Sequence, residues 1–132
     1  MRNSIVGPLA LIAGLCALPV AASAESYICA ITEVYECEDV TGCKEVSTNT
    51  VNLAELMVLD TEKKTLTGAS LNEKAQSEEI EGLAITDKHI FLHGHQDEES
   101  WNTTISLEDG ALTGGIASGA SSFALFGHCT KK

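Results

Sequence analysis

Apolar and polar residues alternate along most of the chain beyond residue 25, and this period of two predicts β-strands. The clearest alternation covers residues 101–107, where every second position is apolar or Thr: Trp101, Thr103, Ile105 and Leu107. Asp109-Gly110 follows directly and is typical of a hairpin turn. The pattern therefore predicts a strand, a tight turn and a returning strand.

Seven further short strands are predicted where β-branched and aromatic residues are bounded by turn residues. Together with residues 101–107 they make about eight, over 27–35, 53–59, 65–69, 83–85, 89–96, 112–116 and 123–129. Successive strands with short connections indicate an all-β fold, a small antiparallel meander. We expect a closed or nearly closed barrel with the first strand beside the last, because closure removes exposed edges.

Two segments leave the choice of element open. In residues 53–59, Leu53, Leu56 and Met57 would also share one face of a helix, although the polar turn at 60–64 favours a strand in a hairpin. Residues 70–82 are the most polar part of the chain. Ser70 and Glu73 have the spacing of a capping box, which predicts one or two helical turns, with a solvated loop as the alternative.

The N-terminal residues 1–24 have the layout of a secretory signal peptide. Arg2 precedes an apolar run over residues 5–20, and Ala22-Ser23-Ala24 ends the segment with small residues. The run is shorter than the roughly 20 residues of a membrane-spanning helix. We therefore predict cleavage, a periplasmic or secreted protein with no membrane span, and one β domain over residues 25–132.

Four cysteines follow residue 24, and an oxidising compartment favours their pairing. They are Cys29, Cys37, Cys43 and Cys129. Four cysteines allow three connectivities, of which we favour Cys37 with Cys43 across a small acidic loop and Cys29 with Cys129 between the first and last strands. A zinc site is the alternative, but no Cys-x2-Cys pair is present. The barrel would then be stapled by two disulfides.

Acidic residues dominate the charge of the chain. It carries 19 Asp and Glu against 8 Lys and Arg, for a net charge of −11 at pH 7. Nucleic acid and anionic membrane surfaces are bound mainly through basic residues, so both are poor partners. A basic protein or a metal ion would be attracted instead.

Three histidines alternate along the predicted strand over residues 89–96. His89, His93 and His95 share one face with Phe91, whereas the other face carries Ile90, Leu92 and Gly94. His93 and His95 would lie about 7 Å apart, which suits zinc or copper(II), whereas His89 is too distant. Possible further ligands are Asp97, Glu98, Glu99 and His128. The alternative is that these histidines are ordinary polar residues of an exposed face.

No motif indicates an enzyme. Gly-x-Ser-x-Gly is absent, and the cysteines are expected to be oxidised. Carboxylate pairs such as Glu78 with Glu79 and Glu98 with Glu99 lie in polar segments, where solvation is expected to keep their acidity ordinary. We therefore predict a protein that binds and does not catalyse.

The ends of the chain resemble a known family. Tyr27-Ile28-Cys29 near the start and Cys129 near the end are similar to the Tyr-x-Cys and terminal cysteine of the small periplasmic inhibitors of C-type lysozyme. That family carries a Ser-Gly-x-x-Tyr inhibitory loop, whereas Ser118-Gly119 here leads to Phe123, one residue later. The resemblance implies a secreted barrel and makes a basic enzyme such as lysozyme a candidate partner.

These observations predict an exported, small, acidic binding protein whose ligand the sequence does not identify. A metal ion at His93 and His95, zinc or copper, is the most specific form of this hypothesis. Two alternatives remain, a periplasmic inhibitor of a basic cell-wall enzyme and a structural envelope protein without a discrete ligand.

Overall fold

Antiparallel strands make up most of the computed structural model, which describes residues 24–69 and 76–132. The described residues form ten strands and one short 3-10 helix, η1, Thr48–Val51. The strands are β1 Ser26–Glu38, β2 Gly42–Val46, β3 Leu56–Asp60, β4 Thr65–Ala69, β5 Gln76–Glu79, β6 Gly82–Ile85, β7 His89–Gln96, β8 Glu99–Ser106, β9 Ala111–Ala117 and β10 Ser121–Lys131.

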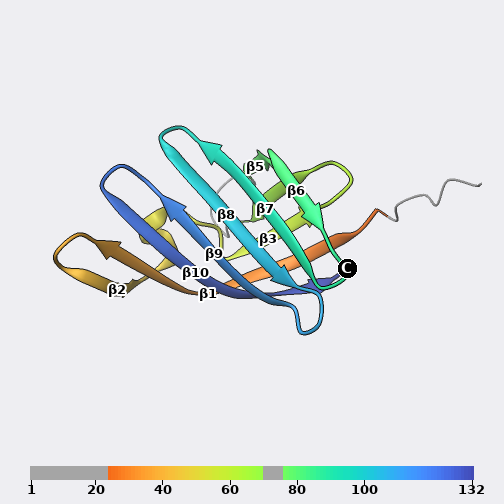
Figure 1. Ribbon diagram of the computed structural model, residues 1–132, viewed down its shortest axis with the longest axis horizontal. Helices are drawn as coiled ribbons and strands as arrows, with labels where there is room; N and C mark the ends of the chain where they lie inside the picture. The colour runs from red at the N-terminus through yellow and green to blue at the C-terminus, as the bar shows by residue number, and fades with distance from the viewer. Residues whose placement is uncertain (1–23, 70–75) are drawn as a thin grey trace, which may run out of the picture.

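The strands form one sheet that curls into a half-barrel (Figure 1). Their order is β5-β4-β3-β1-β10-β9-β8-β7-β6, and β2 lies beside the far half of β1. This confirms the predicted all-β antiparallel meander. The described residues form ten strands where about eight were predicted, because β2 and β5 are too polar to show an apolar alternation.

Strand β5 corrects the prediction for the polar segment 70–82. The proposed capping box at Ser70 and Glu73 lies outside the described residues. From Gln76 to Glu79 the chain is a strand that pairs with β4, neither a helical turn nor a loop. The backbone hydrogen bonds of this pairing do not depend on side-chain polarity, so a polar segment can take an edge position.

The first and last strands lie side by side, as predicted. β1 pairs with β10 from Tyr27↔Lys131 to Glu38↔Ser121. The sheet does not close into a full barrel. It stays open between its two end strands, β5 and β6, although these follow each other in the chain. At their junction, the amide of Ile80 donates to the carbonyl of Lys64 and that of Glu81 to the carbonyl of His93, both at 3.0 Å. The chain thus crosses from the β4 side to the β7 side of the half-barrel.

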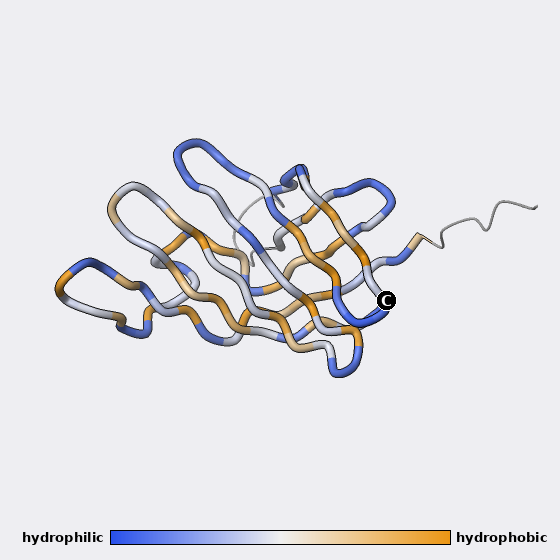
Figure 2. The backbone as a smooth tube through the Cα atoms, viewed as in Figure 1, coloured by the Kyte–Doolittle hydropathy of each residue, from blue (hydrophilic) through white to orange (hydrophobic). Residues whose placement is uncertain are grey.

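The inner face of the sheet holds the core. The most deeply buried large side chains are Leu59, Ile90, Ile105, Val34 and Cys29, and in Figure 2 the apolar stretches run along the strands while polar residues gather at several turns. A bulge between Ile31 and Glu33 shifts the pairing of β1 with β10. The extra residue exchanges the two faces of the strand, so Cys29 and Ile31 are buried before it and Val34 after it.

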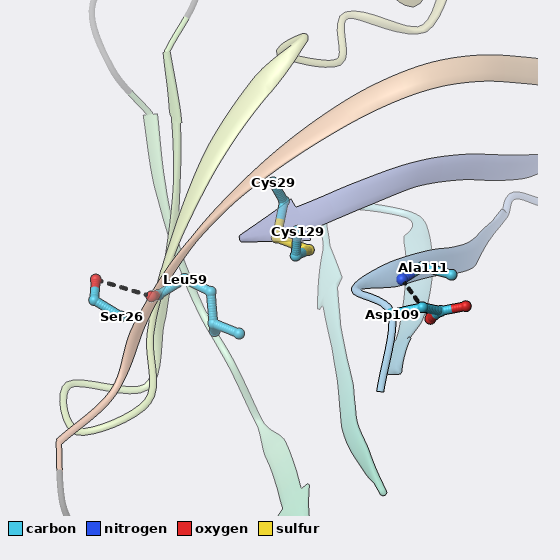
Figure 3. Close-up of a disulfide and its surroundings, with 6 residues drawn as sticks. All are labelled: Ser26, Cys29, Leu59, Asp109, Ala111 and Cys129. Carbon is cyan, nitrogen blue, oxygen red and sulfur yellow. Dashed lines mark hydrogen bonds between the residues drawn. A yellow bond between two sulfur atoms is a disulfide. The ribbon is translucent and has the colours of Figure 1, made fainter. Parts of the chain in front are cut away.

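Both predicted disulfides are present. Cys29 joins Cys129 across β1 and β10, and Cys37 joins Cys43 across β1 and β2. Each pair has a Cα–Cα distance of 4.0 Å and faces its partner directly in the strand register. Figure 3 shows the first of them, which links β1 to β10.

Candidate ligand-binding cavity

A cavity of about 470 Å³ lies at the open end of the half-barrel. This volume falls within the range of roughly 300–1,000 Å³ that is typical of small-molecule sites. Its apolar wall contains Val51, Leu53, Ala54, Met57, Leu66, Trp101, Ile116 and Leu125. Its polar lining contains Asn49, Asn52, Gln76, Glu78, Gln96, Glu99 and Thr103.

The period of two in β8 places three side chains on the cavity. Glu99, Trp101 and Thr103 all line it, whereas the intervening Ser100 and Asn102 are exposed. Ile105, the next residue of this face, is fully buried in the core. The inner face of β8 therefore runs from an acidic residue at the mouth, over an aromatic ring, to the apolar interior.

Trp101 forms a wall of the cavity by packing on a glycine of the neighbouring strand. Gly94 faces it across the β7–β8 pair, and a Cβ at Gly94 would lie 2.6 Å from Cζ2 of the indole. The indole Nε1 is buried and has no hydrogen-bond partner among the described residues. A buried donor without a partner costs about 1–3 kcal/mol. The protein thus holds an incompletely satisfied polar group at this wall.

Glu78 projects from β5 onto the same cavity. Burial raises the pKa of its carboxyl group above the usual value, and the negative charge of Glu99 raises it further. This corrects the expectation of ordinary acidity for Glu78. The segment is polar, but the curled sheet places this side chain against apolar walls and a second carboxylate.

We expect Glu78→Gln to stabilise the protein at neutral pH by a small amount, below about 1 kcal/mol, because the side chain is only half-buried. A raised pKa means that the folded state binds the proton more tightly than the unfolded state. The stabilisation that comes from the proton on Glu78 is therefore fully present below the pKa of 4.5 in the unfolded state. It is lost as the pH rises through the raised pKa of the folded state.

Urea denaturation from acidic to neutral pH would measure this effect. The free energy of unfolding of the variant should exceed that of the parent at neutral pH and converge with it in acid. Glu99→Gln should give part of the same gain, because it removes the second cause of the shift. A variant that is less stable than the parent at neutral pH would contradict the assignment.

The histidines of β7 lie on the opposite face of the sheet from this cavity. Ile90 and Leu92 are buried, whereas His93 and His95 are exposed, so the predicted assignment of the two faces is confirmed. The His95 Nδ1 contacts a carboxylate oxygen of Glu81. The His93 ring lies over Gly82, where a Cβ would be 1.9 Å from Nε2.

The structure does not bring a third predicted ligand to His93 and His95. No group of three or more His, Cys, Asp or Glu side chains suited to a metal ion occurs within residues 24–69 and 76–132. His128 lies on β10, three strands from β7 and hence roughly 14 Å away. It lines a separate hollow of about 440 Å³ at the other end of β8. Zinc or copper binding stays a prediction.

The segment compared with the inhibitory loop of the lysozyme inhibitors connects β9 and β10. Its turn is closed by the amide of Ser118, which donates to the carbonyl of Ser121 at 2.9 Å. Phe123, at its end, is half-buried and packs against the core. The aromatic side chain therefore contributes to the interior of the half-barrel.

No family model, curated protein or solved structure matches this chain. Within the part of the chain that the structure describes, there is no helix long and apolar enough to cross a membrane. The function must therefore be argued from the geometry of the cavity.

Proposed function

We propose that this protein binds a small amphipathic molecule in the cavity at the open end of the half-barrel, and that it acts by binding without catalysis. The cavity itself is the observation that supports the proposal. Its volume of about 470 Å³ suits a small molecule. A space of that size between well-formed strands is the default candidate for a ligand site.

The lining favours a ligand with an apolar body and a polar end. Met57, Leu66, Ile116 and Trp101 contribute apolar surface to the lining, and the polar side chains come from β5, from η1 and the residue after it, from the end of β7 and from β8. An apolar group on this wall would be removed from water, while a polar group at the mouth could keep its hydrogen bonds.

The scaffold suits a protein that works outside the cytoplasm. Its two disulfides fit an oxidising, extracytoplasmic location. A periplasmic or secreted carrier or sensor of a small molecule is the form of the function that we propose. A half-barrel fixed by covalent links offers a preorganised cavity, and preorganisation lowers the entropic cost of binding.

Titration with dansyl amide, a neutral fluorophore sensitive to polarity, would test the proposal. We expect its emission to shift to the blue on binding. Trp101 is the only tryptophan of the chain and lines the cavity, so bound dye should also accept excitation energy from it. Leu66→Trp, which fills the cavity, should weaken binding by about tenfold or more.

Leu107→Trp is the matched control, because Leu107 lies in the hollow at the other end of β8 and adds the same bulk there. This variant should bind the dye as the parent does. Melting curves of both variants would establish that they are folded. Equal affinity of the parent and a folded Leu66→Trp variant, or no energy transfer from Trp101, would overturn the proposal.

A further inference from the structure

Two carboxylates from distant strands meet at the mouth of the cavity. Glu78 comes from β5 and Glu99 from β8, and the charge of Glu99 acts directly on Glu78. Both line the cavity, and the lining residues that belong to 24–69 and 76–132 include no Lys, Arg or His. The mouth therefore concentrates negative charge in front of an apolar wall.

Neither carboxylate is neutralised within residues 24–69 and 76–132. The ion pairs there involve other acidic residues, namely Glu25, Glu36, Asp60 and Glu81. Glu78 is partly desolvated and lies in the field of Glu99. A positive charge near both carboxylates would relieve the repulsion and the loss of hydration of Glu78. The cavity is thus electrostatically complementary to a cation.

The wall behind the carboxylates indicates which kind of cation fits. Hard metal ions such as calcium take six to eight oxygen ligands, whereas here the indole of Trp101 and the side chains of Met57 and Leu66 lie in the same cavity. An organic cation can place its charge near carboxylates and aromatic ring and its hydrocarbon part on the apolar wall.

We infer that the ligand is an amphipathic organic cation, whose ammonium group lies between Glu78 and Glu99 and whose apolar part lies against Trp101, Met57 and Leu66. This inference rests on the proposed binding function of the cavity and specifies its ligand class. Selectivity arises because an anionic amphiphile of the same shape would meet two carboxylates and no basic side chain among the described lining residues.

Three probes of matched chain length test the charge preference: octylammonium, octanol and octanoate. Their affinities can be followed by the fluorescence of Trp101 at neutral pH in low salt. We expect the affinity for octylammonium to be at least about tenfold higher than that for octanol, because a charge-assisted hydrogen bond in a partly buried site is stronger than a neutral one. Octanoate should bind most weakly. Competition with dansyl amide would verify that all three enter the same cavity.

Charge-removing variants identify the residues responsible. Glu78→Gln and Glu99→Gln should each lower the affinity for octylammonium by about tenfold and leave that for octanol unchanged. Glu79→Gln is the matched control, because Glu79 is the exposed neighbour on β5 and does not line the cavity. It should alter neither affinity.

The outcomes separate this inference from the function on which it rests. Equal binding of octylammonium and octanol, unaffected by Glu78→Gln and Glu99→Gln, would overturn the cation assignment while the cavity still binds amphiphiles. A loss of octylammonium affinity in Glu79→Gln as large as in Glu78→Gln would overturn it too, since general surface charge would then explain the preference. If dansyl amide fails to enter the cavity as well, the proposed function itself is wrong.

Discussion

Replacement of Cys29 and Cys129 by alanine is expected to lower the free energy of unfolding by about 4–5 kcal/mol. The bond joins residues separated by 100 positions, so its loss frees nearly the whole described chain in the unfolded state. A domain of this size is stabilised by only about 5–15 kcal/mol. Urea denaturation of the oxidised variant should therefore show a protein at the limit of stability.

The second disulfide provides the matched control. Cys37 and Cys43 are separated by only 6 positions, and their replacement by alanine should reduce stability by about 2 kcal/mol. Because Cys29 and Cys129 are buried, alanine there also removes core atoms. Comparing the oxidised and reduced forms of the Cys37→Ala, Cys43→Ala variant isolates the long link with its sulfurs in place. Similar losses for the two disulfides would contradict the chain-entropy argument.

The position of the Cys29–Cys129 disulfide could be predicted because it depends on local patterns at the two ends of the chain. Cys29 lies in an alternating apolar segment and Cys129 ends another, so pairing of the first and last strands brings them together. The same period of two placed Ile90 and Leu92 of β7 on the buried face. Such alternation is a property of each strand alone, and the sequence carries it directly.

The cavity could not be predicted, because it is lined by residues of strands that are distant in the sequence and do not pair with one another. Glu78 and Glu99 lie in segments whose polarity suggested full solvation, and nothing local places β5 opposite β8. Trp101 was recognised as a strand residue, yet only the curvature of the sheet turns it into a wall of the cavity. The curvature of the sheet brings residues of β3, β4 and β5 into one cavity with residues of β8 and β9, and this curvature is a property of the whole sheet.

The histidines show how far a local pattern reaches, because the spacing of His93 and His95 predicts a pair of side chains and leaves a metal site untested. His93 and His95 share the exposed face of β7, as predicted. His128 lies three strands away on β10. Residue spacing within one strand fixes a pair of side chains, whereas a third ligand depends on strand order, which spacing does not contain.

Gly127→Ala is expected to reduce the free energy of unfolding by about 3 kcal/mol. A Cβ at Gly127 would lie 2.1 Å from the carbonyl oxygen of Ala30 and 3.2 Å from Cα of Ile31. Both are backbone atoms of β1 next to its bulge, so no side-chain rotation can relieve the overlap. The two central strands must separate, and urea denaturation would measure the loss.

Gly119→Ala is the control, because a Cβ there has no neighbour within 4 Å. Its stability should stay within about 0.5 kcal/mol of the parent.

In the sheet order, β1 and β10 lie between the strand that carries Glu78 and the strand that carries Glu99. Forcing β1 and β10 apart should therefore also change the distance between the two carboxylates. We expect Gly127→Ala, and not Gly119→Ala, to weaken octylammonium binding under conditions where both variants are folded; unchanged binding would show that the cavity is held independently of the central strand pair.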